Sequence, residues 1–250
     1  MSKSNQYLLI TGASSGLGRV MCINLSKKYN IVLHGRDEVR LQQTLELCNS
    51  ERAHLIFKLD LTDLKIVEQS ISEFIVGNKI EIVGFVHCAG YMKMLPLKMI
   101  SLSLIETTFA TNVFAASLLI KTLMARKVNN NSLRSIVFLS SNISNFGAKA
   151  FSVYAASKGA LDSFMRCLAV ELAPLVRVNS VLPGAIKTEM TEQIFNNEEV
   201  KERMKHEYPL GLGSPDDIYE MVEFLLSEKS KWITGQQFVV DGGRTINISG

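Results

Sequence analysis

Short runs of β-branched and apolar residues alternate along this chain with longer stretches of helical periodicity. Such alternation favours a parallel sheet that is covered by helices on both faces. Runs such as 31–33 and 136–139 are apolar without alternation, as expected of strands that are buried on both sides. We therefore predict an α/β fold with a doubly wound parallel sheet of about seven strands, near residues 7–11, 31–35, 53–58, 82–87, 134–140, 176–182 and 237–240.

The length of the chain favours a single domain. At 250 residues the chain can bury a sizeable core, and no repeat, low-complexity tract or linker divides it. We predict one domain over 1–250. The segment 189–213 stands apart, because it is charged and Asn-rich at its centre and too long for an ordinary connection. We expect it to be partly helical and to act as a lid over a substrate.

Composition excludes several kinds of partner. Lys and Arg exceed Asp and Glu by only 27 − 24 = 3, and the basic residues are scattered, so we expect no nucleic-acid partner. The apolar stretch between Glu106 and Lys121 is too short for a membrane span and is interpreted as a buried helix. The four histidines show no metal-ligand spacing, so no metal is predicted. Four scattered cysteines and no recognisable signal peptide favour a cytoplasmic location. Since the charge balance gives no sign of a nucleic-acid partner, we expect a small-molecule partner.

The stretch TGASSGLG, residues 11–18, follows the first predicted strand and opens a helix. Such a turn directs backbone N–H groups and the positive end of a helix dipole at one point, which suits a pyrophosphate. Its spacing, G-x-x-x-G-x-G, departs from the common G-x-G-x-x-G fingerprint, so taken alone it fits a nucleotide site and a structural turn equally well. In a nucleotide site, the loop would contribute Gly12, Ser14, Ser15, Gly16, Leu17 and Gly18.

The end of the second strand bears on which nucleotide would bind. In dinucleotide folds an acid about 20 residues after the glycines binds the ribose of NAD, whereas an arginine accommodates the 2′-phosphate of NADP. Here Gly35 stands in the place of the acid and Arg36 follows it. The residues favour NADP(H) over NAD(H). A shift of the strand end by one or two residues would instead make Asp37 the ribose acid.

Tyr154 and Lys158 stand four residues apart in a helical pattern, so the phenol and the ammonium share one helix face. A tyrosine ordinarily titrates near pH ~10. The nearby Lys158 ammonium and the positive nicotinamide of an oxidised cofactor would lower its pKa and fit it for acid–base work. Ser141, at the end of the fifth predicted strand, is the candidate hydroxyl that would hold a substrate carbonyl. The alternatives are an exposed helix face and a serine that caps its own turn.

Taken in order, these motifs resemble those of the classical short-chain dehydrogenases/reductases, and the resemblance covers nearly the whole chain. It implies a single Rossmann-type domain and catalysis by Asn112, Ser141, Tyr154 and Lys158. In this reading Tyr154 donates a proton to the alkoxide that a hydride from NADPH creates, Lys158 lowers the pKa of Tyr154, and Asn112 holds a water in a proton relay. Further cofactor contacts implied by the resemblance are Asp60, Leu61, Ala89, Gly90, Tyr154, Lys158, Gly184, Ile186 and Thr188.

The chain departs from the family pattern at several places. His87 replaces an asparagine that braces the sheet, and we interpret it as a structural replacement. Ser15 stands where NADP-binding members often carry a basic residue, which leaves the phosphate to Arg36. The whole chain is most similar to 3-oxoacyl-[acyl-carrier-protein] reductases. The basic residues with which those enzymes hold an acidic carrier are represented only by Arg126 and Lys127.

The function expected from the resemblance is NADP(H)-dependent reduction of a small carbonyl compound, free or bound to a carrier, by a homotetramer or homodimer. An NAD-dependent alcohol or sugar dehydrogenase of the same family stays open, as does a non-catalytic protein that senses the cofactor. A sugar-nucleotide epimerase is disfavoured, because those relatives carry a different glycine spacing and a larger C-terminal region.

Overall fold

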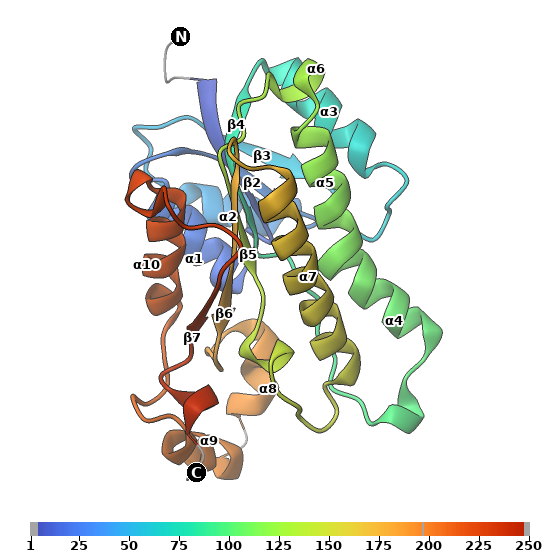
Figure 1. Cartoon of the computed structure of the whole chain (residues 1–250), viewed down its shortest axis with the longest axis vertical. Coiled ribbons are helices and arrows are strands. Elements are labelled where there is room, and N and C mark those ends of the chain that lie inside the picture. Colours follow the sequence, from blue (N-terminus) through green and yellow to red (C-terminus); the bar gives the residue numbers. More distant parts are fainter. Residues whose placement is uncertain (1–4, 197, 248–250) are drawn as a thin grey trace.

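The computed structural model describes residues 5–196 and 198–247. Its centre is a seven-stranded sheet in the order β3-β2-β1-β4-β5-β6-β7, in which every neighbouring pair is parallel (Figure 1). The predicted α/β fold with about seven parallel strands is confirmed. The strands are β1 Gln6–Thr11, β2 Asn30–Gly35, β3 His54–Lys58, β4 Glu81–His87, β5 Ser135–Leu139, β6 Arg177–Pro183 and β7 Gln237–Val240.

Helices cover both faces of this sheet and bury two separate hydrophobic cores. Within β1, Leu9 belongs to one core, whereas Leu8 and Ile10 belong to the other. Because successive side chains of a strand point to opposite faces, a strand covered on both sides must be apolar throughout. One face is covered by α3 Val67–Asn78, α5 Ala115–Leu123 and α7 Ser152–Glu171, and the other by α1 Gly16–Leu25, α2 Glu38–Glu46 and α10 Pro215–Leu226.

The order of the strands reverses between β1 and β4. From β1 the chain first builds outward through β2 and β3, and it then returns to add β4 on the other side of β1. The loops after β1 and β4 therefore run to opposite sides of the sheet and leave a crevice at its carboxyl edge, where ligands bind in open α/β sheets.

The helix from Leu102 to Leu123 contains α4 Leu102–Phe109, a π-helical turn Ala110–Phe114, and α5. By length and hydropathy alone it would be able to cross a membrane, and half of its most apolar window is buried inside the protein. Leu119 and Leu123 are fully buried in the core shared with α3 and α7. A buried helix was predicted here from the sequence. In the structure one face of the helix is buried, in agreement with that prediction, and the other face is not.

The segment between β6 and α10 is partly helical, as predicted. It contains a short 3₁₀ turn Glu189–Thr191, α8 Glu192–Phe195 and α9 Glu198–Glu207, while residue 197 lies outside the described residues. Phe195, Met204 and Tyr208 form a small hydrophobic cluster of their own, apart from the two main cores. The segment is therefore packed mainly on itself and on the loop after β6.

Candidate active site

A cleft of about 900 Å³ lies at the carboxyl edge of the sheet, where the topology predicts it. Of the predicted site residues, all of which the structure describes, every one lines this cleft except Asn112. Parts of the chain more than 200 residues apart meet here, from Gly12 to Arg244. Among residues 5–196 and 198–247, no group of three or more His, Cys, Asp or Glu side chains is placed to hold a metal ion.

The glycines of the loop after β1 are required by close backbone contacts. Gly12 has φ +70°, and a Cβ there would lie 2.8 Å from the amide nitrogen of Ala89. A Cβ on Gly18 would lie 2.1 Å from the carbonyl oxygen of Gly12. Gly16, with φ +51°, also has left-handed backbone.

The first turn of α1 opens into the cleft without a side-chain cap, because Ser15 makes no capping hydrogen bond, and it carries no acidic residue. The N-terminal end of a helix carries a partial positive charge and unpaired N–H groups. A pyrophosphate fits this cradle of bare backbone, so the loop matches the nicotinamide dinucleotide that the sequence predicts.

The end of β2 lies where the sequence placed it. The strand stops at Gly35, and Asp37 caps α2 by accepting a hydrogen bond of 3.1 Å from the amide of Arg40. The pKa of Asp60 is lowered mainly by the amide of Thr62, which donates a hydrogen bond of 2.9 Å to its carboxylate. The charge of Arg36, which lines the cleft, lowers it as well. The capping role of Asp37 weighs against the alternative in which it binds the ribose.

Tyr154, Ser141 and Lys158 meet in the middle of the cleft. Burial raises the pKa of Tyr154 to about 12, and a hydrogen bond with the Ser141 hydroxyl acts in the opposite direction. The lowered pKa predicted for Tyr154 is therefore wrong for the protein without cofactor. The reason is the burial of the phenol. The Lys158 ammonium lies 5.7 Å from the centre of the phenol ring and donates its hydrogen bond of 2.7 Å to the carbonyl of Leu139.

Lys158 is itself strongly affected by burial, which lowers its pKa to about 8, while the carboxylate of Asp162 acts to raise it. Asp162 also accepts hydrogen bonds from the hydroxyls of Ser140, at 2.9 Å, and Ser144, at 2.7 Å. It thus ties the loop that carries Ser141 to the helix that carries Tyr154 and Lys158. The sequence analysis missed Asp162, although its position four residues after Lys158 on the same helix face was a usable signal.

Asn112 is fully buried in the π-helical turn and does not itself line the cleft. Its side-chain oxygen accepts a hydrogen bond of 2.7 Å from the amide of Tyr91, and its side-chain nitrogen donates to the carbonyl of Tyr91 and to the hydroxyl of Ser157. The side chain therefore braces the segment after β4, and the water on Asn112 stays a prediction. A π-helical turn is a common feature of functional sites.

His87 is fully buried at the end of β4, where its Nδ1 lies 2.9 Å from the Thr11 hydroxyl. Burial, together with the charge of Lys158, lowers the pKa of His87 to about 3. The imidazole is thus neutral at any physiological pH, which fits the predicted structural role. It links the carboxyl ends of β1 and β4.

The other end of the cleft consists of side chains that the sequence analysis did not identify. Arg244 stacks over the ring of Phe146 at 6.0 Å and pairs with Glu207 of α9 at 3.1 Å. The Tyr208 hydroxyl accepts a hydrogen bond of 3.0 Å from the amide of Ala185, in the loop that contains Gly184, Ile186 and Thr188. Apolar side chains that further line the cleft are Met92, Met94, Phe151 and Met204.

Comparison with known proteins agrees with this geometry. The family model described as "Enoyl-(Acyl carrier protein) reductase" matches residues 12–245. L-xylulose reductase of Caenorhabditis elegans is 32% identical over 98% of this chain and 97% of its own length. The 3-oxoacyl-[acyl-carrier-protein] reductase FabG of Rickettsia bellii is 28% identical over 96% of this chain and 97% of its own length.

A solved structure of 4-hydroxyisoleucine dehydrogenase complexed with NADH matches 97% of this chain and 100% of its own, with a TM-score of 0.89 and 25% identity. The chain therefore belongs to the classical short-chain dehydrogenase/reductase family. It is an oxidoreductase of the kind that acts on CH–OH or C=O groups with a nicotinamide cofactor.

Proposed function

We propose that this chain reduces a carbonyl compound to a secondary alcohol with NADP(H) as the cofactor, and that Tyr154 is the proton donor. The observation that carries the proposal is the meeting of Tyr154, Ser141 and Lys158 in one cleft with the bare backbone cradle after β1. The cradle supports cofactor binding, and the three side chains support proton transfer beside it.

The state of each side chain fits its proposed part. With a pKa of about 12, Tyr154 is protonated throughout the physiological range and can give its proton to a developing alkoxide. Ser141 is in contact with the phenol and would donate a hydrogen bond to the same substrate oxygen. When bound, the reduced cofactor supplies the hydride. Lys158 holds a positive charge beside the phenol below about pH 8 and would favour the phenolate that forms after proton transfer.

NADP(H) is proposed over NAD(H) on the residues at the end of β2. Gly35 offers no carboxylate, Asp37 is engaged as the cap of α2, and Arg36 lines the cleft beside them. An arginine is suited to a phosphate, because its planar guanidinium can donate two parallel hydrogen bonds. Since a solved relative carries NADH, this part of the proposal rests on the residues of this chain alone.

The substrate is proposed to be a mainly apolar carbonyl compound, with 3-oxoacyl thioesters as one candidate. Methionine and aromatic side chains line the far end of the cleft and favour an acyl chain over a sugar. One relative is named for the reduction of 3-oxoacyl groups on a carrier protein, which supports the first candidate. Another is named for the reduction of L-xylulose, so a sugar is the second candidate.

The test is to follow oxidation of NADPH and of NADH against a panel that contains acetoacetyl thioesters, keto sugars and simple ketones. We expect turnover with NADPH and at least one member of the panel. Binding of NADPH without turnover of any member would favour a non-catalytic protein that senses the cofactor, and turnover with NADH alone would overturn the cofactor assignment.

A further inference from the structure

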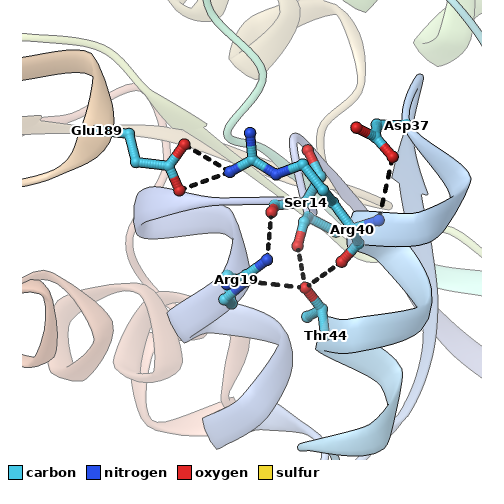
Figure 2. Close-up of polar contacts among 7 residues, drawn as sticks. Ser14, Arg19, Asp37, Arg40, Thr44 and Glu189 are labelled. Atoms are coloured by element: carbon cyan, nitrogen blue, oxygen red, sulfur yellow. Dashed lines mark hydrogen bonds and ion pairs between the residues drawn. The ribbon is translucent and has the colours of Figure 1, made fainter.

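One ion pair joins two distant segments at the rim of the cleft. Arg40, in the first turn of α2, places its Nη2 atom 2.5 Å from both carboxylate oxygens of Glu189, which begins the segment after β6 (Figure 2). Arg40 lines the cleft, and so do Thr188 and Met190 on either side of Glu189. The pair therefore lies across the edge of the cofactor site.

The backbone around Arg40 is held in a fixed position relative to the glycine loop. The Thr44 hydroxyl, one turn further along α2, donates a hydrogen bond of 3.0 Å to the carbonyl of Ala13 and accepts one from Arg19, also at 3.0 Å. The same Arg19 donates to the carbonyl of Ser14 at 2.7 Å (Figure 2). These contacts fix α2 against the loop, so Arg40 reaches the cleft from a rigid base.

Arg40 and Arg36 both line the cleft on the side where β2 ends at Gly35. Arg40 uses a single nitrogen for Glu189, whereas a guanidinium carries five N–H donors in a fork that matches a phosphate. The side chains of Arg40 and Glu189 are 37% and 56% exposed, and ion pairs with this exposure are weak. A phosphate dianion next to Gly35 would therefore be a stronger partner for Arg40 than Glu189 is.

We propose that Arg40 is a second binding residue for the 2′-phosphate of NADP(H) and that Glu189 competes with that phosphate for it. This inference rests on the proposed function, since it requires a cofactor with a 2′-phosphate. Glu189 weakens the binding of NADP(H) by occupying Arg40 and by repelling the phosphate, and it leaves NAD(H) almost unaffected. The residue that tunes cofactor choice thus comes from the segment after β6, far in sequence from the arginines it acts on.

The rival explanation is that the pair only clips the segment 189–213 to α2. The two explanations predict opposite effects of Glu189→Gln on the binding of a ligand with a 2′-phosphate. If the pair is a clip, Arg40→Ala and Glu189→Gln both loosen the same contact and change the binding of every cofactor in the same direction. If the inference is right, Arg40→Ala weakens binding of the 2′-phosphate, whereas Glu189→Gln strengthens it.

The experiment measures dissociation constants of adenosine 2′,5′-bisphosphate and of 5′-AMP by calorimetry, and those of NADPH and NADH by the fluorescence of the bound nicotinamide. For the two ligands with a 2′-phosphate, we expect Arg40→Ala to raise the dissociation constant about tenfold or more. Glu189→Gln should lower it about threefold. The dissociation constants of 5′-AMP and NADH should change by less than about twofold. In the Arg40→Ala background, Glu189→Gln should have a smaller effect than in the wild type, because only the repulsion of the phosphate is left to remove.

Matched controls come from a second ion pair, between Glu38 of α2 and Lys58 at the end of β3. Lys58 and Glu38 lie 3.1 Å apart, both are well exposed, and neither lines the cleft. Lys58→Ala and Glu38→Gln make the same changes of charge and should alter the four dissociation constants by less than about twofold. Weaker binding of adenosine 2′,5′-bisphosphate to Glu189→Gln, or an equal change for 5′-AMP, would overturn the inference.

The same measurements separate this inference from the proposed function. If the wild-type chain binds 5′-AMP as tightly as adenosine 2′,5′-bisphosphate and Arg36→Ala changes neither constant, the NADP(H) proposal itself fails. If the wild type prefers the 2′-phosphate and Arg36→Ala removes that preference, while Arg40→Ala and Glu189→Gln leave it unchanged, only the role of Arg40 and Glu189 fails.

Discussion

At the cofactor end of the cleft, backbone lies against backbone, whereas at the substrate end the walls are side chains. Gly12 and Gly18 sit at distances from Ala89 and from each other that leave no room for a Cβ. At the far end, by contrast, Arg244 and Glu207 belong to segments that pack through side chains, around Tyr208 and its small cluster. The same cleft is thus rigid by necessity at one end and adjustable by substitution at the other.

The difference explains where each property of the enzyme is encoded. A backbone contact that excludes every side chain admits only glycine, so the cofactor end has a fixed sequence pattern. Side chains that line a pocket can be exchanged for others of similar size, and they change what the pocket accepts without changing the fold. We therefore expect cofactor binding to be sensitive to single methyl groups and substrate choice to respond gradually.

The largest effect is expected where the two ends meet, at Tyr154. Tyr154→Phe removes the proton donor and keeps the ring, so carbonyl reduction should fall by about 100-fold to 10,000-fold while the dissociation constant of NADPH changes little. Single-turnover kinetics and cofactor titration measure the two quantities separately. Unchanged turnover would refute the role of Tyr154 as the acid.

The cofactor end should not tolerate one added methyl group. Gly18→Ala forces a Cβ against the Gly12 carbonyl, and we expect a loss of about 1–3 kcal/mol in the free energy of unfolding together with much weaker cofactor binding. Gly77→Ala in α3 is the matched control, because nothing lies within 4 Å of its added Cβ. That variant should be more stable than the wild type by about 0.5–1 kcal/mol in urea unfolding. Equal behaviour of the two variants would contradict the packing argument.

The next largest effect is expected from Lys158, whose lowered pKa determines how the free energy of unfolding changes with pH. The pKa falls from 10.5 in the unfolded chain to about 8 in the folded one, so between these values the unfolded chain binds more protons and stability rises with pH. Relative to Lys158→Met, the wild type should therefore gain about 2 kcal/mol of unfolding free energy between pH 7 and pH 9.5. Parallel pH profiles of the two proteins would show that Lys158 titrates normally.

The smallest effect is expected at the substrate end. Arg244→Ala removes an ion pair with Glu207 in which the two side chains are 30% and 21% exposed, and pairs that stay in contact with solvent contribute about 0–1 kcal/mol. It should change the KM for the carbonyl substrate by less than about tenfold and leave the dissociation constant of NADPH as it is. A matching loss of cofactor affinity would mean that the two ends are not independent.

The cofactor end of the cleft could be predicted from the sequence better than the substrate end. The strand positions and the places of Gly12, Ser141 and Tyr154 were predictable, because hydrophobic periodicity and backbone necessity leave patterns in a single chain. Arg244 was missed, since a side chain that reaches a site from a distant segment leaves no local pattern. Asp162 was missed although it stands four residues after Lys158 on the same helix, because that spacing does not show which groups the carboxylate contacts.

The lowered pKa of Tyr154 was wrong for the protein without cofactor, for a different reason. The spacing of four residues gives the shared helix face, but it does not show how deeply the phenol is buried or that the Lys158 ammonium is held by the Leu139 carbonyl. Electrostatic terms depend on depth and on every neighbouring group, and only the assembled structure supplies these.

The central claim, NADP(H)-dependent reduction with Arg36 at the 2′-phosphate, is tested most directly by one ratio. The kcat/KM for NADPH divided by that for NADH, with the same carbonyl substrate, should exceed one for the wild type and fall about tenfold or more in Arg36→Ala. A wild-type ratio below one, or a ratio that Arg36→Ala leaves unchanged, would contradict it.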